Sequence, residues 1–121
     1  MSAFPFPHER LDAWRLARQA RVLEYRYTLS LPKGWADEAK QINKAAASVV
    51  RNTCEGADRW KPNEKIHKFE IAQGEAGEAA GAVQSLLDLE LGDAAIAAEF
   101  LATDARVAAM LTGLIRRLRP G

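Results

Sequence analysis

Apolar residues recur every three or four positions along four stretches of the chain, and polar or charged residues fill the positions between them. This spacing is typical of amphipathic α-helices that bury one face. It predicts helices at residues 8–30, 35–57, 62–91 and 94–118. Helices joined by connections this short pack as antiparallel neighbours. The sequence therefore predicts an all-α fold, an antiparallel up-down four-helix bundle.

Proline and glycine mark the breaks between these stretches. Pro32 and Gly34 end the first pattern, because the residue before a proline avoids the helical conformation and glycine permits a turn. Pro62 suits the first turn of the third helix. Asp93, directly after Gly92, is expected to cap the N-terminus of the fourth helix.

The composition is that of an ordinary globular domain. The chain has 121 residues, of which 48% are hydrophobic and 27% charged. We expect one bundle domain at residues 8–121 behind an N-terminal extension at residues 1–7. The single cysteine, Cys54, allows no intrachain disulfide and fits a reducing compartment. Because neither a leader pattern nor an uncharged stretch of transmembrane length is recognisable, we expect a cytoplasmic protein with no membrane partner.

Three glycines, Gly74, Gly77 and Gly81, lie on one face of the predicted third helix. A glycine inside a helix costs about 1 kcal/mol relative to alanine, so a compensating contact is expected. Two explanations stay open, and they can coexist. The glycines allow close packing inside the bundle, or they form an interface between subunits.

Polar residues also stand on the apolar faces. Asn52 and Gln73 occupy positions where the helical pattern calls for apolar side chains, and Glu55 lies close to Asn52. Buried amides need hydrogen-bond partners, so we expect a polar cluster. It would set the register of the helices, cap the second helix, or form a binding site at the corner between the second and third helices.

Charge is distributed unevenly along a chain whose net charge is only +1. Residues 69–105 contain no lysine or arginine but eight acidic residues, so the end where the third helix meets the fourth should be acidic. The opposite end should be basic and is a candidate nucleic-acid interface, in which an exposed aromatic ring can stack on bases. Its candidate residues are Arg51, Arg59, Trp60, Lys61, Lys65, Lys68, Arg116, Arg117 and Arg119. The alternative is that these cations are solvated and complement helix C-termini.

Catalytic chemistry is not evident. Glu64 and His67 form one Glu-x-x-His element, whereas a di-iron bundle needs two such elements and two further glutamates. The other histidine is His8, so we expect no metal site and no cofactor. Cys54 would be an activated nucleophile only if His67 packed against it, and packing is the simpler role of a small thiol. We expect neither an enzyme nor a small-molecule substrate.

The segment from Lys44 to Arg59, KAAASVVRNTCEGADR, resembles the hallmark segment of the four-helix bundle proteins encoded in 23S rRNA intervening sequences. The next helix carries FEIAQGEAGE, similar to that family's A-x-G-x-x-x-E element. Lys44 replaces the family's usual arginine, Thr53 and Cys54 replace Ile-Ala, and Glu75 replaces serine. The matching motif residues, to which we assign structural roles, are Ser48, Asn52, Glu55, Gly56, Gly74 and Glu78, with Leu11 and Trp14 near the start.

The resemblance covers about residues 8–90 and implies a bacterial cytosolic bundle that forms a ring-like homopentamer. Relatives include accessory proteins of diversity-generating retroelements, which bind nucleic acid and a reverse transcriptase. Two hypotheses follow. The chain is a homo-oligomeric scaffold or adaptor, in which the glycine stripe packs between subunits. Alternatively, it is an RNA-binding ring that uses its basic end, accessory to an rRNA intervening sequence or a reverse transcriptase.

Overall fold

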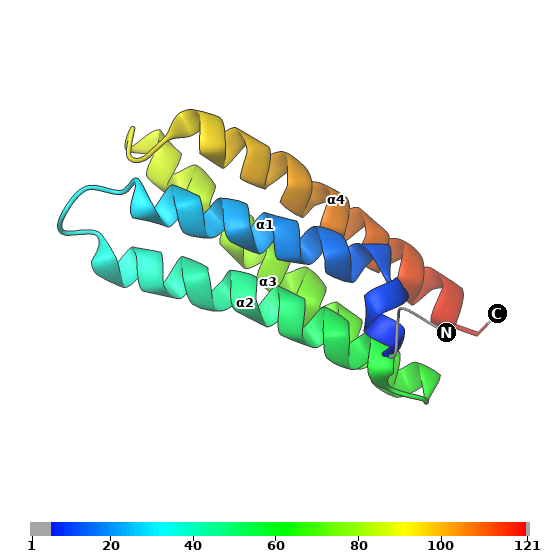
Figure 1. Cartoon of the computed structure of the whole chain (residues 1–121). Coiled ribbons are helices and arrows are strands. Elements are labelled where there is room, and N and C mark those ends of the chain that lie inside the picture. Colours follow the sequence, from blue (N-terminus) through cyan, green and yellow to red (C-terminus); the bar gives the residue numbers. More distant parts are fainter. Residues whose placement is uncertain (1–5, 121) are drawn as a thin grey trace.

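The computed structural model describes residues 6–120 (Figure 1). A short 3-10 helix, η1, precedes four long helices, and residues 6–120 contain no strand. The elements are η1 (Pro7–Arg10), α1 (Asp12–Leu29), α2 (Ala36–Asp58), α3 (Pro62–Asp88) and α4 (Ala94–Leu118). Each long helix exposes a polar face and buries an apolar one, as the spacing predicts.

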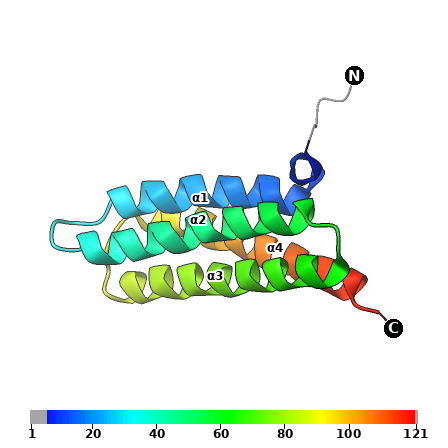
Figure 2. The same ribbon diagram turned by 90° about the horizontal axis from the view of Figure 1, so that it is seen from below.

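The helices run up and down in the order of the sequence, as Figures 1 and 2 show. α1 contacts α2 and α4, and α3 contacts α2 and α4. Within residues 6–120, the backbones of the diagonal pairs α1–α3 and α2–α4 nowhere bring two Cα atoms within 8 Å of each other. The outer faces of α1 and α3 therefore lie on opposite sides of the molecule. This arrangement confirms the predicted antiparallel four-helix bundle.

The core consists of two buried clusters that follow one another along the bundle. One surrounds Phe69 and Leu111, and the other surrounds Tyr27 and Phe100. The Tyr27 hydroxyl donates a hydrogen bond of 2.8 Å to the carbonyl of Leu91, which fastens α1 to the α3–α4 turn. None of the helices in the described part of the chain combines the length and apolarity needed to cross a membrane.

The first predicted helix, residues 8–30, begins too early. Leu11 is extended, with φ −92° and ψ 116°, and separates η1 from α1. The break is stabilised from outside the helix, because the backbone N–H of His8 donates to Asp58 Oδ1 at the end of α2. Leu11 packs against the core on the same stripe as the helical apolar residues, so spacing alone did not reveal the break.

The predicted third helix, residues 62–91, ends too late. α3 stops at Asp88, and the chain then turns through Glu90 and Gly92, whose φ angles are 60° and 79°. Positive φ is incompatible with a continuing right-handed helix. The predicted cap of the next helix is confirmed, because Asp93 Oδ1 accepts hydrogen bonds from the backbone N–H groups of Ala95 and Ile96.

Candidate functional site

The predicted basic residues gather at one end of the bundle, where η1, the α2–α3 turn and the C-terminus of α4 meet (Figures 1 and 2). The exception is Arg51, which lies two turns before the end of α2 and donates a long hydrogen bond of 3.4 Å to Ser48 Oγ. The residues at the basic end are Arg59, Trp60, Lys61, Lys65, Lys68, Arg116, Arg117 and Arg119.

Two of these lysines hold the α2–α3 corner together. Lys65 Nζ donates to the carbonyl oxygens of Gly56 and Ala57, at 3.2 and 2.8 Å, and so satisfies the end of α2. Lys68 Nζ lies 3.0 Å from Glu55 Oε2 in a partly buried ion pair. Both side chains therefore have structural partners. Lys65 complements the C-terminus of α2, as the alternative predicts, whereas Lys68 pairs with a side chain.

Two arginines at this end have exposed partners. Arg59 lies 3.9 Å from Glu64, and Arg119 lies 2.8 Å from Glu70, with all four side chains about half exposed. Exposed ion pairs of this kind contribute little stability. An arginine can therefore leave its carboxylate for a phosphate at small cost.

The basic end also exposes Trp60, Lys61, Arg116 and Arg117. The Trp60 side chain, in the turn between α2 and α3, is 94% exposed. An indole held this far into solvent contributes almost nothing to the core. It is available for stacking on a partner.

An apolar groove of about 300 Å³ opens beside these residues. Its lining includes the apolar residues Phe69, Leu114 and Leu118. The cationic residues of the lining are Arg10, Lys65 and Arg117. This end of the bundle therefore offers both positive charge and apolar surface.

The polar residues on the apolar faces do not form the single cluster that was expected. Asn52 Nδ2 donates to the carbonyl and hydroxyl oxygens of Ser48 on its own helix, at 2.9 and 3.0 Å. Gln73 instead donates to the Thr112 hydroxyl on α4. Because Glu55 pairs with a lysine of α3, the seam contains separate, locally satisfied polar groups.

The glycine stripe does not pack inside the bundle, so the first explanation for it is wrong. Gly74, Gly77 and Gly81 are exposed, and a Cβ added to any of them would have no neighbouring atom within 4 Å. Gly56 differs, because its Cβ would lie 2.6 Å from the Phe69 ring. The missing side chains leave a glycine notch on the outer face of α3. No contact within residues 6–120 explains why glycine stands at these three positions.

A second exposed stripe lies on α1. Val22, Tyr25 and Leu29 are 58%, 53% and 67% exposed and repeat the three- and four-residue spacing of the glycines. They point away from the core on the helix diagonally opposite α3. This stripe was not predicted from the sequence. It could have been recognised from the apolar residues that lie outside the core face of the first helix.

The opposite end of the bundle is less acidic than predicted. The α1–α2 loop brings the exposed Lys33 to the same end as the acidic α3–α4 turn. Asp104 is only 4% exposed, so its carboxyl belongs to the core and not to the surface. Burial raises its pKa to about 7.

Glu24 of α1 is a second buried acid that sequence reasoning missed. It is 1% exposed, and its Oε2 atom has no hydrogen-bond partner. Burial raises the Glu24 pKa to about 7, against an opposing effect of nearby Arg21.

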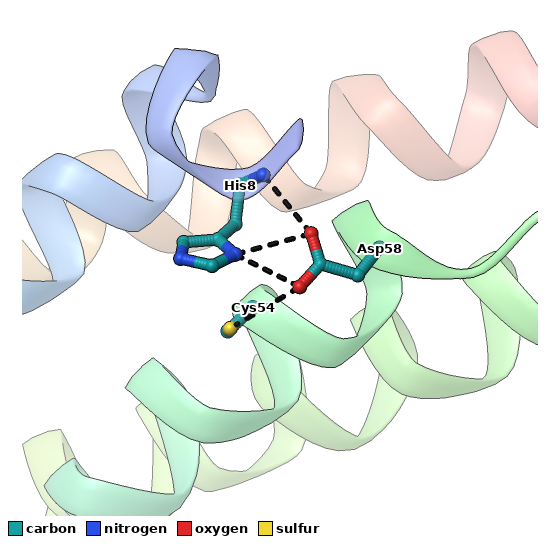
Figure 3. Close-up of side chains that lie close together, drawn as sticks. All are labelled: His8, Cys54 and Asp58. Atoms are coloured by element: carbon teal, nitrogen blue, oxygen red, sulfur yellow. Dashed lines mark hydrogen bonds and ion pairs between the residues drawn. The ribbon is translucent and has the colours of Figure 1, made fainter. Parts of the chain in front are cut away.

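Cys54 lies beside His8 and Asp58 (Figure 3). His67, the partner that an activated thiol would need, is instead exposed on α3. Cys54 Sγ lies 3.7 Å from Asp58 Oδ2, and His8 Nδ1 lies 2.8 Å from the same oxygen. Burial raises the pKa of the Cys54 thiol, and the negative charge and hydrogen bond of Asp58 raise it further. Activated cysteine nucleophiles have lowered pKa values, so this surrounding does not activate the thiol.

A family described as 23S rRNA-intervening sequence protein matches residues 9–113 of the chain. The match begins in η1 and extends through α1, α2 and α3 into α4. No curated protein matches the chain.

Proposed function

Because the chain belongs to the 23S rRNA-intervening sequence protein family, we propose that it is a non-enzymatic cytosolic scaffold that assembles into a ring-like homo-oligomer. The observation that carries this proposal is the pair of exposed stripes on opposite sides of the bundle. One is the apolar ridge of Val22, Tyr25 and Leu29 on α1. The other is the glycine notch on α3.

The two stripes have the same spacing of three and four residues. Glycines without a Cβ let another helix approach closely, and side chains spaced by three and four residues pack as a ridge into a groove of matching spacing. A contact between two different faces is heterologous. Repeated from copy to copy, it produces a closed ring when the successive rotations add up to a full turn. Burial of the ridge against the notch would offset the roughly 1 kcal/mol that each exposed glycine costs the single bundle. A five-membered ring is the form that the family resemblance implies.

Changing either stripe is expected to break the assembly. We expect Gly77→Gln, which fills the notch, and Leu29→Glu, which charges the ridge, each to reduce the mass in solution to that of a monomer. Ala102→Gln, at an exposed position of α4, is the matched control and should leave the mass unchanged. Light scattering coupled to size exclusion measures the masses. A monomeric unmodified protein, or an oligomer that survives both changes, would contradict the proposal.

Mixing the two variants tests the heterologous contact itself. Gly77→Gln retains an intact ridge and Leu29→Glu an intact notch, so a mixture should form a dimer that contains one copy of each. An interface that pairs identical faces would produce no such dimer.

A second candidate function is RNA binding at the basic end. The observation that favours it is Trp60, 94% exposed between Arg59 and Lys61. Aromatic rings stack on unpaired bases while neighbouring cations contact phosphates. A ring would present several copies of this surface and bind multivalently. RNA from an rRNA intervening sequence, or an RNA engaged by a reverse transcriptase, is the kind of ligand that the resemblance suggests.

Binding to a single-stranded RNA of mixed sequence at low salt tests this candidate by fluorescence anisotropy. Trp60→Ala should weaken binding by about 1–3 kcal/mol for the stacked base. Lys61→Glu with Arg117→Glu should weaken it at least tenfold and flatten its salt dependence. Lys40→Glu, exposed towards the other end of α2, is the control. Equal losses in the control, or no binding by the unmodified protein, would exclude this candidate.

A further inference from the structure

Three potential metal ligands from two distant parts of the chain converge near the basic end (Figure 3). His8 comes from η1, while Cys54 and Asp58 lie one turn apart on α2. One ligand atom from each residue lies within 4.8 Å of the others. Sequence reasoning missed this cluster because more than forty residues separate His8 from Cys54.

The imidazole of His8 is held in a defined orientation. Phe6 stacks on it, with ring centroids 5.5 Å apart and planes 14° apart. Trp14 meets it edge-on at 4.6 Å. Its Nδ1 atom points at Asp58, and the side chain is 15% exposed. The ring therefore has little freedom to turn its nitrogen away, and such preorganisation is characteristic of metal ligands.

We propose that His8 Nδ1, Cys54 Sγ and a carboxylate oxygen of Asp58 bind one Zn²⁺ ion. Nitrogen, thiolate and carboxylate donors are the ligands that zinc takes in tetrahedral sites, with bonds of about 2.0–2.3 Å. Such bonds place the donor atoms roughly 3.3–3.8 Å from each other. The Cys54–Asp58 separation of 3.7 Å is already in this range, whereas Asp58 and His8 must move apart from 2.8 Å.

Binding exchanges protons for the metal. The Cys54 thiol releases its proton to solvent. His8 Nδ1 also loses the proton that it shares with Asp58, so the imidazole that binds the metal is neutral, with its one proton on Nε2 and the lone pair of Nδ1 on the metal. The backbone N–H of His8, 3.1 Å from Asp58 Oδ1, goes on orienting the carboxylate. Water takes the fourth position, on the side where the Asp58 side chain is 34% exposed.

A bound zinc ion would cross-link η1 to the end of α2. Pro7, Arg10 and Leu11, next to His8, form one wall of the apolar groove at the basic end. Zinc would therefore fix that wall in place. This inference does not depend on the ring or on RNA binding.

Cobalt titration of the metal-free protein tests the site. We expect one equivalent of Co²⁺ to produce the intense visible bands of tetrahedral cobalt and a thiolate-to-cobalt charge-transfer band, and Zn²⁺ to displace it. His8→Gln and Cys54→Ser should each weaken binding at least tenfold and abolish the rise in Tm that zinc causes. His67→Gln, which changes the exposed histidine of α3, is the matched control and should behave like the unmodified protein.

The charge-transfer band decides the outcome. Pale, six-coordinate cobalt without this band, or an unchanged spectrum in Cys54→Ser, would overturn the proposal. The proposal would also be overturned if His67→Gln lost metal binding to the same extent as His8→Gln and Cys54→Ser. Circular dichroism checks that each variant is folded, and if His8→Gln loses helix, the Cys54→Ser spectrum alone decides, since serine replaces a half-buried sulfur with little change of shape.

Discussion

Replacing Glu24 by glutamine is expected to stabilise the bundle at pH 8 and to have little effect at pH 4. The Glu24 carboxyl is 1% exposed, and its pKa is raised from 4.5 to about 7. At pH 8 the unmodified protein must either bury a charge or retain a proton that the unfolded chain has lost. The free energy of unfolding is therefore lowered by about 3 kcal/mol, which lowers Tm by more than about 10 °C. Glutamine has nearly the same shape but does not ionise.

The direction of the pH dependence follows from the two states. Below about pH 4 the folded and the unfolded chain both hold the proton, so Glu24 adds no pH dependence. Between 4.5 and about 7 only the folded protein holds it, so stability falls as pH rises. Above about 7 the penalty is complete. The difference between Glu24→Gln and the unmodified protein should grow over this window and then level off.

Thermal unfolding at fixed protein concentration, from pH 4 to pH 8, measures this difference. Asp104→Asn should behave in the same way, because burial raises the Asp104 pKa from 3.8 to about 7. Asp37→Asn, at an exposed position in the first turn of α2, is the control. If the Glu24→Gln curve runs parallel to that of the unmodified protein, the pKa of Glu24 is not raised in the folded state.

Most of the fold could be predicted because it depends on local pattern. Its signals are local, since each one determines the structure of residues only a few positions away. These signals are the four apolar stripes, the proline at the start of α3 and the aspartate before α4. The errors at Leu11 and Asp88 arose where the structure depends on distant contacts. His8 is held by Asp58 from α2, and Gly92 packs under Tyr27 from α1.

The candidate sites were predicted less completely, for a related reason. The sequence places cations at one end but does not say which are already paired, and Lys65 and Lys68 turn out to hold the α2–α3 corner. It shows that α3 is rich in glycine but not which glycines touch a neighbouring helix. His8 and Cys54 come together only because α1 folds back along α2.

The glycines test most directly whether a position is determined by local pattern or by contact with a neighbouring helix. Gly56→Ala is expected to destabilise the bundle by up to about 2 kcal/mol, because overpacking costs about 1–3 kcal/mol and the helical preference of alanine returns about 1 kcal/mol. The new Cβ would lie 2.6 Å from Phe69 Cε1 and 3.2 Å from Lys68 Cβ. The ring is 3% exposed and belongs to the core cluster, so turning it aside would disturb the residues packed around it. Gly113→Ala on α4 should stabilise by about 0.5–1 kcal/mol, since nothing lies within 4 Å of its Cβ.

Combining Gly56→Ala with Phe69→Leu identifies the cause. Leucine removes the ring atoms that the new methyl group would strike, although Phe69→Leu alone is destabilising because it leaves a void in the core. If the clash is the cause, the double variant should lose less stability than the sum of the two single losses, as urea denaturation would measure. Strict additivity would show instead that the Phe69 ring is not the cause, and would leave the contact of 3.2 Å with Lys68 Cβ as the source of the loss.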